Sequence, residues 1–567
     1  NDSKIHVLNH GLHYASSVFE GERAYNGKIF KSEEHTQRFF EGAQTMDMEI
    51  PFTQSEILNA KKELIISNGL KDAYVRPIAW RGSEMMAVSA QKTTINVAID
   101  SSPAGLDPHL ITAFNSVIIV QNNIYEGLTN IDSDLSVNPG LAKSWEVSSD
   151  GLKYTFNLHS NVTFHDGSKM DAEDVKASIL RVQNKDMASP LASRVSPVKS
   201  IDVLNSNTIV LELNEPFAAI LSSLAGIAIV PSEFQNDTEA LQKIPVGTGP
   251  FKFDSWQPNS HIQLNKFGQY RTEGLPKLDS VKVSFVPEAA TRQVGLSNGE
   301  YDILPGVDPA TALQLQANPN VEIYQTRNLS YTLLGMNTTR EPLNNANVRK
   351  AINLLLNRNE IIQGALFGAG VPGGPLSPAL ATWALDTNNF SCYTNDVAEA
   401  KKLINEASIK TPIELEILVL PRQDAKDISQ VIQQQLNQGG FNITLANKEI
   451  GEFVQDWKNS DFDMFVSANG GNPDPDQYFY RTFRTGGSTN VFKYSDNEVD
   501  TWLDQGRKST STSERKSIYD KVQQKLACEG PISHLAYGDL STAVNKKVKG
   551  FEIYATGRLA SLISVTK

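Results

Sequence analysis

Residues 150–175 read DGLKYTFNLHSNVTFHDGSKMDAEDV, and this stretch decides the fold class. From Tyr154 to Leu158 every second residue is apolar, which predicts a strand with one buried face. Asp166-Gly167 is typical of a tight turn, and Asp171 is a suitable N-cap for the amphipathic helix that follows. A half-buried strand followed by a capped helix predicts mixed α/β structure.

The same pattern of short alternating strands and capped helices continues to the C-terminus. Alternating apolar residues predict strands at Thr94–Ile99, Ile209–Leu213, Val281–Phe285 and Ile413–Val419. Apolar stripes predict helices from Ile428 to Leu436, before Gly439, and from Ile518 to Leu526, before Gly530-Pro531. No internal repeat or low-complexity tract interrupts this part of the chain, so we expect an α/β fold throughout it.

The first ninety or so residues predict a separate, small α+β unit. Its expected elements are strands at Lys4–Leu8, Gly27–Phe30 and Ala73–Trp80 and helices at Glu33–Thr45 and Thr53–Asn68. The pattern restarts after Gln91, and no Gly/Ser-rich or Pro-rich linker separates the two parts. We therefore expect a domain boundary at about residue 92, with an abrupt joint.

Length, composition and charge limit the class of protein. The 567 residues exceed the size at which one hydrophobic core stops growing, so several domains are expected. Apolar residues at 40% and charged residues at 20% are typical of a folded globular chain. Lys and Arg number 52 against 64 Asp and Glu, and this net charge of -12 argues against nucleic acid or an anionic membrane as the partner.

The sequence contains no segment expected to span a membrane. The longest apolar run, Ala218 to Val230, is shorter than the roughly 20 residues that a bilayer-spanning helix needs. The chain begins Asn1-Asp2-Ser3, without Met and without the charged-then-apolar pattern of a secretory signal. We interpret this start as a missing leader or as the start of a fragment.

Cysteine and histidine usage indicates no metal centre. Cys392 and Cys528 are too few for a disulfide scaffold or a cysteine-rich metal site, and one bridge and two buried thiols both remain open. The spacing of His6, His10 and His13 could suggest a metal, but no partner set of Cys or carboxylates lies nearby. We interpret these three residues as loop and turn histidines.

Residues 1–92 carry a specific family resemblance. The stretches are VLNHGLHYASSVFEG at 7–21, EHTQR at 34–38 and AYVRP at 73–77. They closely resemble the N-terminal domain of the branched-chain amino acid aminotransferases, fold-type IV enzymes that use PLP. The resemblance implies that Arg38 would hold the cofactor phosphate, and that Tyr14, Phe19 and Arg76 would shape the substrate side. Arg76 would take a carboxylate, because a guanidinium donates two parallel hydrogen bonds.

The resemblance stops before the second domain of that family begins. The second domain supplies the Schiff-base lysine and most of the cofactor cleft, and without that lysine no electron sink assembles. We therefore expect no bound cofactor and no aminotransferase activity, with Arg38 and Arg76 as vestigial contacts. The segment is interpreted as a truncated relic or as a fusion or assembly artefact, so that a non-functional chimera stays open as a third alternative.

Residues 93–567 resemble a second family over their whole length. The 150–175 stretch is the most specific match, and the others are LDPH at 106–109, YEGL at 125–128, PGLAKSWE at 139–146, GTGPF at 247–251, VRKAIN at 348–353 and PDPD at 473–476. This part is similar to the family 5 extracytoplasmic solute-binding proteins, the peptide and nickel binders of ABC importers. Chance does not explain so many matches in one order.

This resemblance implies a type II, cluster C binding-protein fold, in which two α/β lobes close about a hinge around a solute. We place lobe I at 93–258 and 535–567, and lobe II at 259–534. The resemblance further implies a monomeric, periplasmic or extracytoplasmic protein that delivers its solute to the importer's permease subunits. Closure makes and breaks no bond, so we expect a binding protein and no enzyme.

The expected solute is peptide-like. In dipeptide-binding members an acid three positions before the Asp-Pro pair takes the amino terminus, and here Gly471 stands there, so a free dipeptide is expected to bind poorly unless Asp474 or Asp476 substitutes. Arg422 follows the Ile413–Leu420 strand in a loop suited to the carboxylate. The remaining expected contacts are Asn469, Asn472, Tyr331 and Phe114. An anionic end and a neutral or displaced amino group are the expected features.

Overall fold

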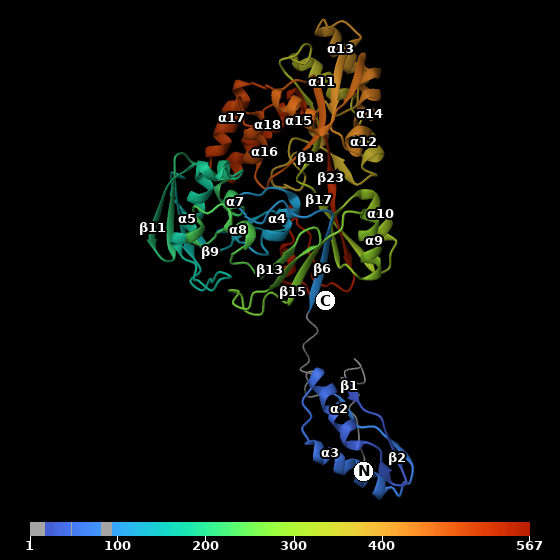
Figure 1. The fold of residues 1–567 in the computed structure, drawn as a ribbon. Coiled ribbons are helices and arrows are strands. Elements are labelled where there is room, and N and C mark those ends of the chain that lie inside the picture. Colours follow the sequence, from blue (N-terminus) through green and yellow to red (C-terminus); the bar gives the residue numbers. More distant parts are fainter. Residues whose placement is uncertain (1–16, 47, 81–92) are drawn as a thin grey trace. The chain divides into compact units, whose positions relative to one another are not determined.

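The computed structural model describes residues 17–46, 48–80 and 93–567. The chain divides into two compact units, residues 1–92 and 93–567, at the place where the sequence pattern changes. Figure 1 colours the first unit dark blue and the second from light blue to red. The strand expected at Lys4–Leu8, the three closely spaced histidines and Tyr14 lie outside the described residues.

The first unit is a small α+β fold, as the sequence predicts. Strands β2 (Glu22–Tyr25), β3 (Lys28–Ile29) and β4 (Ala73–Val75) form one sheet, and β1 (Ser17–Phe19) pairs with β5 (Ile78–Trp80). Helices α2 (Ser32–Thr45) and α3 (Gln54–Ser67) accompany them. The strand expected at Ala73–Trp80 is two strands, β4 and β5, interrupted at Arg76-Pro77, and proline lacks the N–H that a strand ladder needs.

The deciding stretch of the second unit folds as predicted. Strand β10 (Lys153–Leu158) lies in a four-stranded sheet whose order is β11-β12-β10-β9, and α5 (Ala172–Gln183) packs against β11. Asp171 caps α5 through the Glu173 N–H and completes a capping box with Asp174. The other strands of this sheet are β9 (Ala142–Val147), β11 (Val198–Asn205) and β12 (Thr208–Leu213).

A large sheet of twelve strands runs through the second unit and has two parts. One part contains β6 (Thr94–Ile99), β13 (Phe251–Gln257), β14 (His261–Lys266), β15 (Ser280–Phe285), β16 (Ile303–Val307) and β17 (Val321–Arg327). The other contains β18 (Tyr331–Met336), β19 (Gly370–Pro372), β20 (Ile413–Val419), β21 (Phe441–Asn447) and β22 (Met464–Asn469). Strand β23 (Ile532–Asn545) belongs to both parts.

The chain passes between the two parts twice, at residues 328–330 and within β23. Residues 539–545 of β23 pair with β17, whereas residues 532–536 pair with β18. We therefore use lobe I for residues 93–327 and 538–567, and lobe II for residues 331–537. Strand pairing does not change at 258/259, where the sequence-based boundary stood, because β14 and β15 continue the lobe I sheet and join it to β6. In Figure 1, β17, β18 and β23 lie where the lobes meet.

Helices cover both parts of the large sheet. Lobe I carries α4 (Phe114–Val120), α6 (Ala192–Val195), α7 (Ile220–Leu224), α8 (Ala240–Lys243), α9 (Ala289–Asn298) and α10 (Pro309–Gln316), together with the hairpin of β7 (Thr129–Ile131) and β8 (Val137–Pro139). Lobe II carries α11 (Ala346–Leu355), α12 (Arg358–Ala365), α13 (Val397–Glu406), α14 (Gln423–Gln438), α15 (Ile450–Asn459), α16 (Pro475–Phe483), α17 (Asn497–Lys508) and α18 (Thr512–Glu529).

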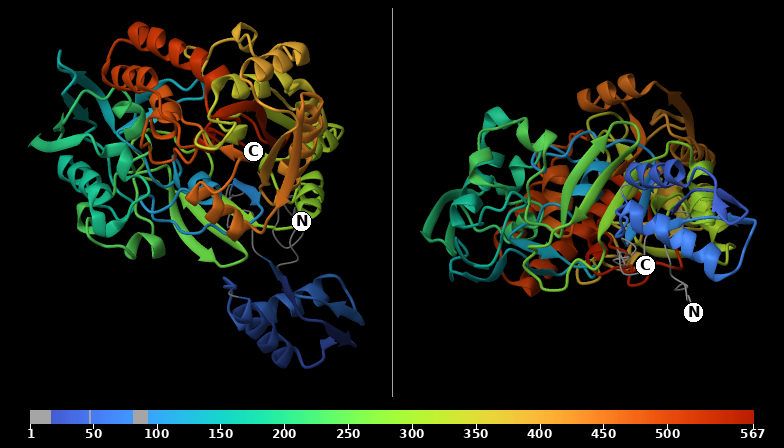
Figure 2. Two further views of the ribbon diagram at one scale, coloured as in Figure 1. Left: turned by 90° about the horizontal axis from the view of Figure 1, so that it is seen from above. Right: turned by 60° about the horizontal axis from the view of Figure 1, so that its bottom comes forward.

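The lobes also meet beside the four-stranded sheet. In the left view of Figure 2, the orange-red helices of lobe II lie beside the teal and green segments of lobe I. The Ala218 N–H donates to the Arg507 carbonyl, and the Arg507 guanidinium lies over the Phe217 ring, 4.9 Å from its centroid. These contacts join the lobes along an edge of the space between them.

A disulfide joins Cys392, ahead of α13, to Cys528 at the end of α18, with the Cα atoms 5.6 Å apart. Of the two alternatives left open by the sequence, the structure therefore shows the bridge. Both cysteines belong to the hydrophobic core of lobe II. The described ranges contain no helix whose length and apolar character would let it cross a bilayer.

Three histidines of the second unit are buried and neutral. Burial lowers the pKa of His109 and of His165 to about 4, and that of His534 to about 3. Unfolding exposes the three rings and returns their pKa to about 6.5, so the unfolded chain binds more protons between pH 6.5 and about 4. Their contribution to stability is therefore present above pH 6.5 and is lost as the pH falls through this window.

We predict that the free energy of unfolding decreases as the pH is lowered from 7 to 5. Unfolding at pH 5.5 should take up about three protons, roughly one on each of these histidines. Calorimetric melts in two buffers of different ionisation enthalpy measure this uptake. A melting temperature and an unfolding enthalpy that are independent of pH and buffer would contradict the prediction.

Candidate functional site

Two cavities in the second unit lie between the lobes and share a wall. The inner cavity has a volume of about 320 Å³ and the outer one about 740 Å³. Thr112, Leu191, Arg194, Gly471, Asn472 and Gln477 line both. The shared residues come from lobe I and lobe II alike, so the two cavities form one cleft.

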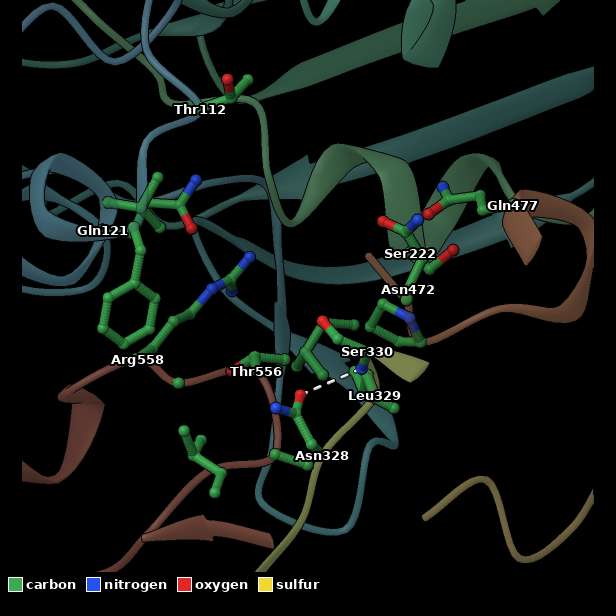
Figure 3. Close-up of a pocket in the computed structure, with 18 of the residues that line it drawn as sticks. Thr112, Gln121, Ser222, Asn328, Leu329, Ser330, Asn472, Gln477, Thr556 and Arg558 are labelled. Atoms are coloured by element: carbon green, nitrogen blue, oxygen red, sulfur yellow. Dashed lines mark hydrogen bonds between the residues drawn. The ribbon is translucent and has the colours of Figure 1, made fainter. Parts of the chain in front are cut away.

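The inner cavity lies against the place where the chain crosses between the lobes. Asn328, Leu329 and Ser330 line it from the first crossing, and Leu540 lines it from β23. The Asn328 side chain holds this segment by accepting a hydrogen bond from the Ser330 N–H at 3.0 Å, which Figure 3 marks. A solute in this cavity therefore touches the crossing itself.

Neutral polar side chains supply most hydrogen-bonding groups of the inner cavity. Figure 3 shows Gln121 and Arg558 on one side and Ser222, Asn472 and Gln477 on the other. The Thr556 hydroxyl is buried and has no hydrogen-bond partner. Gln477 donates to the Ser223 hydroxyl at 3.0 Å and thereby joins lobe II to lobe I at the cavity wall.

Two half-buried arginines of lobe I supply positive charge to the inner cavity. Arg558 makes a single long hydrogen bond, 3.5 Å from its Nη1 to the Asn122 Oδ1, and Arg194 forms no ion pair with any described carboxylate. Burial, together with the charge of Arg194, lowers the pKa of Arg558 to about 10. Burial, together with the charge of Arg481, also lowers the pKa of Arg194. Both guanidiniums remain charged at neutral pH without a counter-ion.

Arg481, on α16 of lobe II, supplies a third such charge in the outer cavity. Its Nη2 donates to the Gly470 carbonyl at 3.2 Å and lies 3.5 Å from the Asn469 Oδ1, whereas its Nε is buried and has no partner. The two other arginines of this cavity are neutralised, since Arg507 pairs with Asp476 and Arg484 with Asp504. Asp476 is the only acid among the described residues that line either cavity.

Four of the eight ligand-binding residues predicted from the sequence line the cleft. Phe114 lines the inner cavity, Gly471 and Asn472 line both, and Asp476 lines the outer one. Asp476 is committed to its ion pair with Arg507, with 3.0 Å between carboxylate and guanidinium. It therefore has little capacity left for a solute ammonium group.

The other four do not line either cavity, and each has a structural partner. Asp474 caps α16 and pairs with Arg515 at 2.7 Å. Tyr331 is 2% exposed in the lobe II core and accepts a hydrogen bond from Asn469 at 2.9 Å. Arg422 donates to Asp424 two residues later and leaves 55% of its side chain exposed.

Sequence reasoning missed all three arginines that point to an anionic ligand. Arg194, Arg481 and Arg558 are far apart in the chain and belong to none of the stretches that carry the resemblance. Their common feature is the absence of an acidic neighbour in space, and a single sequence does not reveal that. Asp474, expected from the sequence as a substitute acid, is the N-cap of α16 instead.

The described residues of the first unit do not form a phosphate site. The Arg38 guanidinium is largely exposed and donates to the Glu20 carboxylate at 2.8 Å. Arg76 lies over the rings of Phe19 and Tyr74, 4.7 and 5.3 Å from their centroids. A guanidinium already paired with a carboxylate is poorly suited to PLP phosphate, so the residues present do not fit this cofactor.

The described residues also show no metal centre, because no three His, Cys, Asp or Glu side chains among them gather in a suitable arrangement.

A two-lobed α/β unit with a cleft at the interlobe crossing, lined by hydrogen-bonding and cationic groups, defines a solute-binding protein.

Comparison with known proteins specifies the family. The model of the bacterial extracellular solute-binding proteins, family 5, matches residues 136–490, which is more than half of the chain. The chain belongs to this family, and its second unit is the substrate-binding component of an ABC importer. The model of the class IV amino-transferases matches residues 17–127, which include the described part of the first unit.

Curated relatives and solved structures agree with this assignment. The glutathione-binding protein GsiB of Pectobacterium atrosepticum is 26% identical over 88% of this chain and 97% of its own. The dipeptide-binding protein of Escherichia coli is 26% identical over 83% and 94%. The structure of DppA from Helicobacter pylori with the peptide STSA is 26% identical, with a TM-score of 0.71 over 85% of this chain and 99% of that one. NikZ from Campylobacter jejuni with Ni(L-His) is 25% identical, with a TM-score of 0.72 over 84% and 100%.

A glycine is required at position 471 because the loop that carries it lies very close to Leu329, in the first crossing between the lobes. A Cβ at this position would overlap the Leu329 carbonyl and the Tyr478 hydroxyl, which are themselves joined by a hydrogen bond of 2.5 Å. At Gly470, the neighbouring position, an added Cβ would meet nothing within 4 Å. The two adjacent glycines therefore form a matched pair for mutation.

We predict that Gly471→Ala lowers the free energy of unfolding by about 1–3 kcal/mol, because the loop must move away from the crossing. Gly470→Ala should change it by less than about 0.5 kcal/mol. Urea unfolding followed by circular dichroism measures both. Equal effects of the two substitutions would show that the approach to Leu329 does not constrain the loop.

Proposed function

We propose that the second unit captures a peptide-like solute through a carboxylate bound by Arg558 and Arg194 in the inner cavity. The observation that carries this proposal is the pair of half-buried guanidiniums that face the cavity without a counter-ion. Burying a charge without a partner costs several kcal/mol, and a carboxylate that accepts two parallel hydrogen bonds compensates this cost. Glutathione-binding and dipeptide-binding relatives support the peptide-like class.

The lining favours a solute whose amino group is acylated or otherwise uncharged. Gly471 stands where an acid would be expected, and Asp476 is already paired with Arg507. A free ammonium group would therefore enter a cleft that contains three uncompensated guanidiniums. The side chains of Gln121, Asn328 and Asn472 suit amide groups instead, because each offers both a donor and an acceptor.

Delivery follows from the family. We infer that the closed, solute-bound form of a monomer docks on the permease subunits of an ABC importer at the outer face of the cytoplasmic membrane, in the periplasm where there is one. A solute stabilises the closed form only as far as it binds that form better than the open one. Arg558 and Arg194 on lobe I and Asn472 on lobe II provide this difference, since one solute reaches them together only when the lobes meet.

The solute proposal predicts a specific pattern of affinities. N-acetyl-Ala-Ala should bind more tightly than Ala-Ala, and N-acetyl-Ala-Ala amide, which lacks the carboxylate, should bind most weakly. Arg558→Gln should weaken N-acetyl-Ala-Ala by about 10- to 100-fold, because a charged hydrogen bond is lost. Isothermal titration calorimetry and thermal shift of the whole chain measure these affinities.

Arg422→Gln is the control for this experiment, since Arg422 is an arginine outside both cavities. It should leave all three affinities unchanged. Tight binding of the amide, or an Arg422→Gln effect as large as that of Arg558→Gln, would refute the carboxylate site.

We also propose that the first unit has no transaminase activity. Arg38 is paired with Glu20, and Lys61, the lysine buried in this unit, is held by Glu22 at 2.6 Å and by the Thr36 hydroxyl. A buried lysine whose amino group is held by a carboxylate and a hydroxyl is not placed to attack a cofactor carbonyl and form an imine.

We predict that pyridoxal phosphate added to the purified chain produces no imine absorption band beyond that of surface lysines, and no turnover of branched-chain amino acids. Absorption spectra before and after borohydride reduction, with a coupled transaminase assay, test this. A band that Lys61→Met removes, accompanied by turnover, would establish a working site.

A further inference from the structure

We propose that the solute carries a second negatively charged group, bound by Arg481 of lobe II in the outer cavity, and is therefore a dianionic, N-acylated peptide-like molecule. This inference rests on the proposed function and deepens it by stating the charge of the solute. It assigns to the outer cavity a ligand group distinct from the carboxylate in the inner one.

The two cavities offer a continuous path between the two charge sites. Arg194 lines both cavities, Arg558 lines only the inner one and Arg481 only the outer one. Asn472 and Gln477 also line both, so neutral hydrogen-bonding groups lie along the shared wall. One extended molecule can therefore place an anionic group at each end and amides between them.

The charges of the cleft favour a solute with more than one negative group. Five arginines line the two cavities, and two of these, Arg484 and Arg507, are neutralised by Asp504 and Asp476. Arg194, Arg481 and Arg558 remain, and a single carboxylate would leave two of these three charges uncompensated. The guanidiniums are close enough to affect one another. The charge of Arg481 helps to lower the pKa of Arg194, and the charge of Arg194 helps to lower the pKa of Arg558.

The geometry of Arg481 indicates a ligand group. Its Nη2 is directed to the Gly470 carbonyl, but its Nε is buried without a partner. An unsatisfied buried donor costs about 1–3 kcal/mol, so the protein alone does not satisfy Arg481, and a carboxylate or phosphate bound at its terminal nitrogens would neutralise its charge. Arg484, which lines the same cavity, differs from Arg481 because its Nε and Nη2 both donate to Asp504, at 3.0 and 3.1 Å.

The three arginines lie on both lobes, so the second negative group of the solute affects closure of the lobes. Arg194 and Arg558 belong to lobe I, and Arg481 belongs to lobe II. Closing the lobes brings like charges together, and the repulsion opposes closure until an anionic solute lies between them. A dianion bound to both lobes therefore favours the closed form more than a monoanion of the same size does.

The test uses isosteric peptides that differ by one charge. N-acetyl-Glu-Ala and N-acetyl-Gln-Ala have the same size, and N-succinyl-Ala-Ala and its succinamoyl analogue, in which an amide replaces the succinyl carboxylate, form a second pair with a longer reach. We expect the wild-type chain to prefer the dianionic member of at least one pair by about 10- to 100-fold in calorimetric titrations. Arg481→Gln should abolish this preference while it leaves the affinity for the monoanionic member within about threefold.

Arg484→Gln is the matched control, because Arg484 lines the same cavity but already has a carboxylate partner. It should preserve the preference, and melting curves should show that both variants are folded. Equal affinities within both pairs, or a preference that survives Arg481→Gln, would overturn the inference while the proposed carboxylate site remains. Failure of all four peptides to bind the wild-type chain would instead overturn the proposed function and this inference together.

Discussion

The structure of the second unit depends on one strand shared between two lobes. Residues 532–536 of β23 pair with β18 of lobe II, and residues 539–545 pair with β17 of lobe I, so a single hydrogen-bonded strand belongs to both sheets. The only other passage between the lobes is short, at residues 328–330, between β17 and β18. A cleft beside two such passages can open and close by a hinge motion because few backbone segments must change conformation.

Charge controls what this hinge can enclose. The cleft brings together three guanidiniums that have no carboxylate of their own, although the chain as a whole carries a net charge of -12. Elsewhere in the described part of the chain, the buried arginines Arg349 and Arg358 also lack a carboxylate, but backbone carbonyls accept their hydrogen bonds. Within the cleft itself, Arg484 and Arg507 are paired with acids. Among the arginines of the cleft, the lack of a carboxylate partner is therefore particular to Arg194, Arg481 and Arg558. An anionic ligand in the cleft explains it better than does a general attraction of the chain for anions.

Much of the fold, and less of the site, could be predicted from the sequence. Local patterns determine β6, β10, α5 and α14, because a two-residue or a 3.6-residue period lies within each segment, and α5 has a capping box as well. The family resemblance supplied the two-lobed architecture and the loop of Gly471 and Asn472. The change of lobe at 328–330 depends on the pairing of β15 with β6 and of β17 with β23, strands that are far apart in the chain. The proposed role of Arg194, Arg481 and Arg558 depends likewise on the acids that are missing around them in space, which one sequence does not reveal.

Gly471 affects both the packing at the hinge and the charge of the cleft. Because the loop that carries it touches the Leu329 carbonyl, the wall shared by the two cavities lies directly against the first crossing between the lobes. An acidic side chain at this position would need the space that the crossing occupies, and it would also neutralise part of the positive field of Arg194. The glycine therefore has two consequences that agree: it permits the close approach of loop and crossing, and it leaves the cleft without an acid for a free amino terminus. The missing acid suits a solute whose amino group is acylated, and the three arginines suit one that is anionic at both ends.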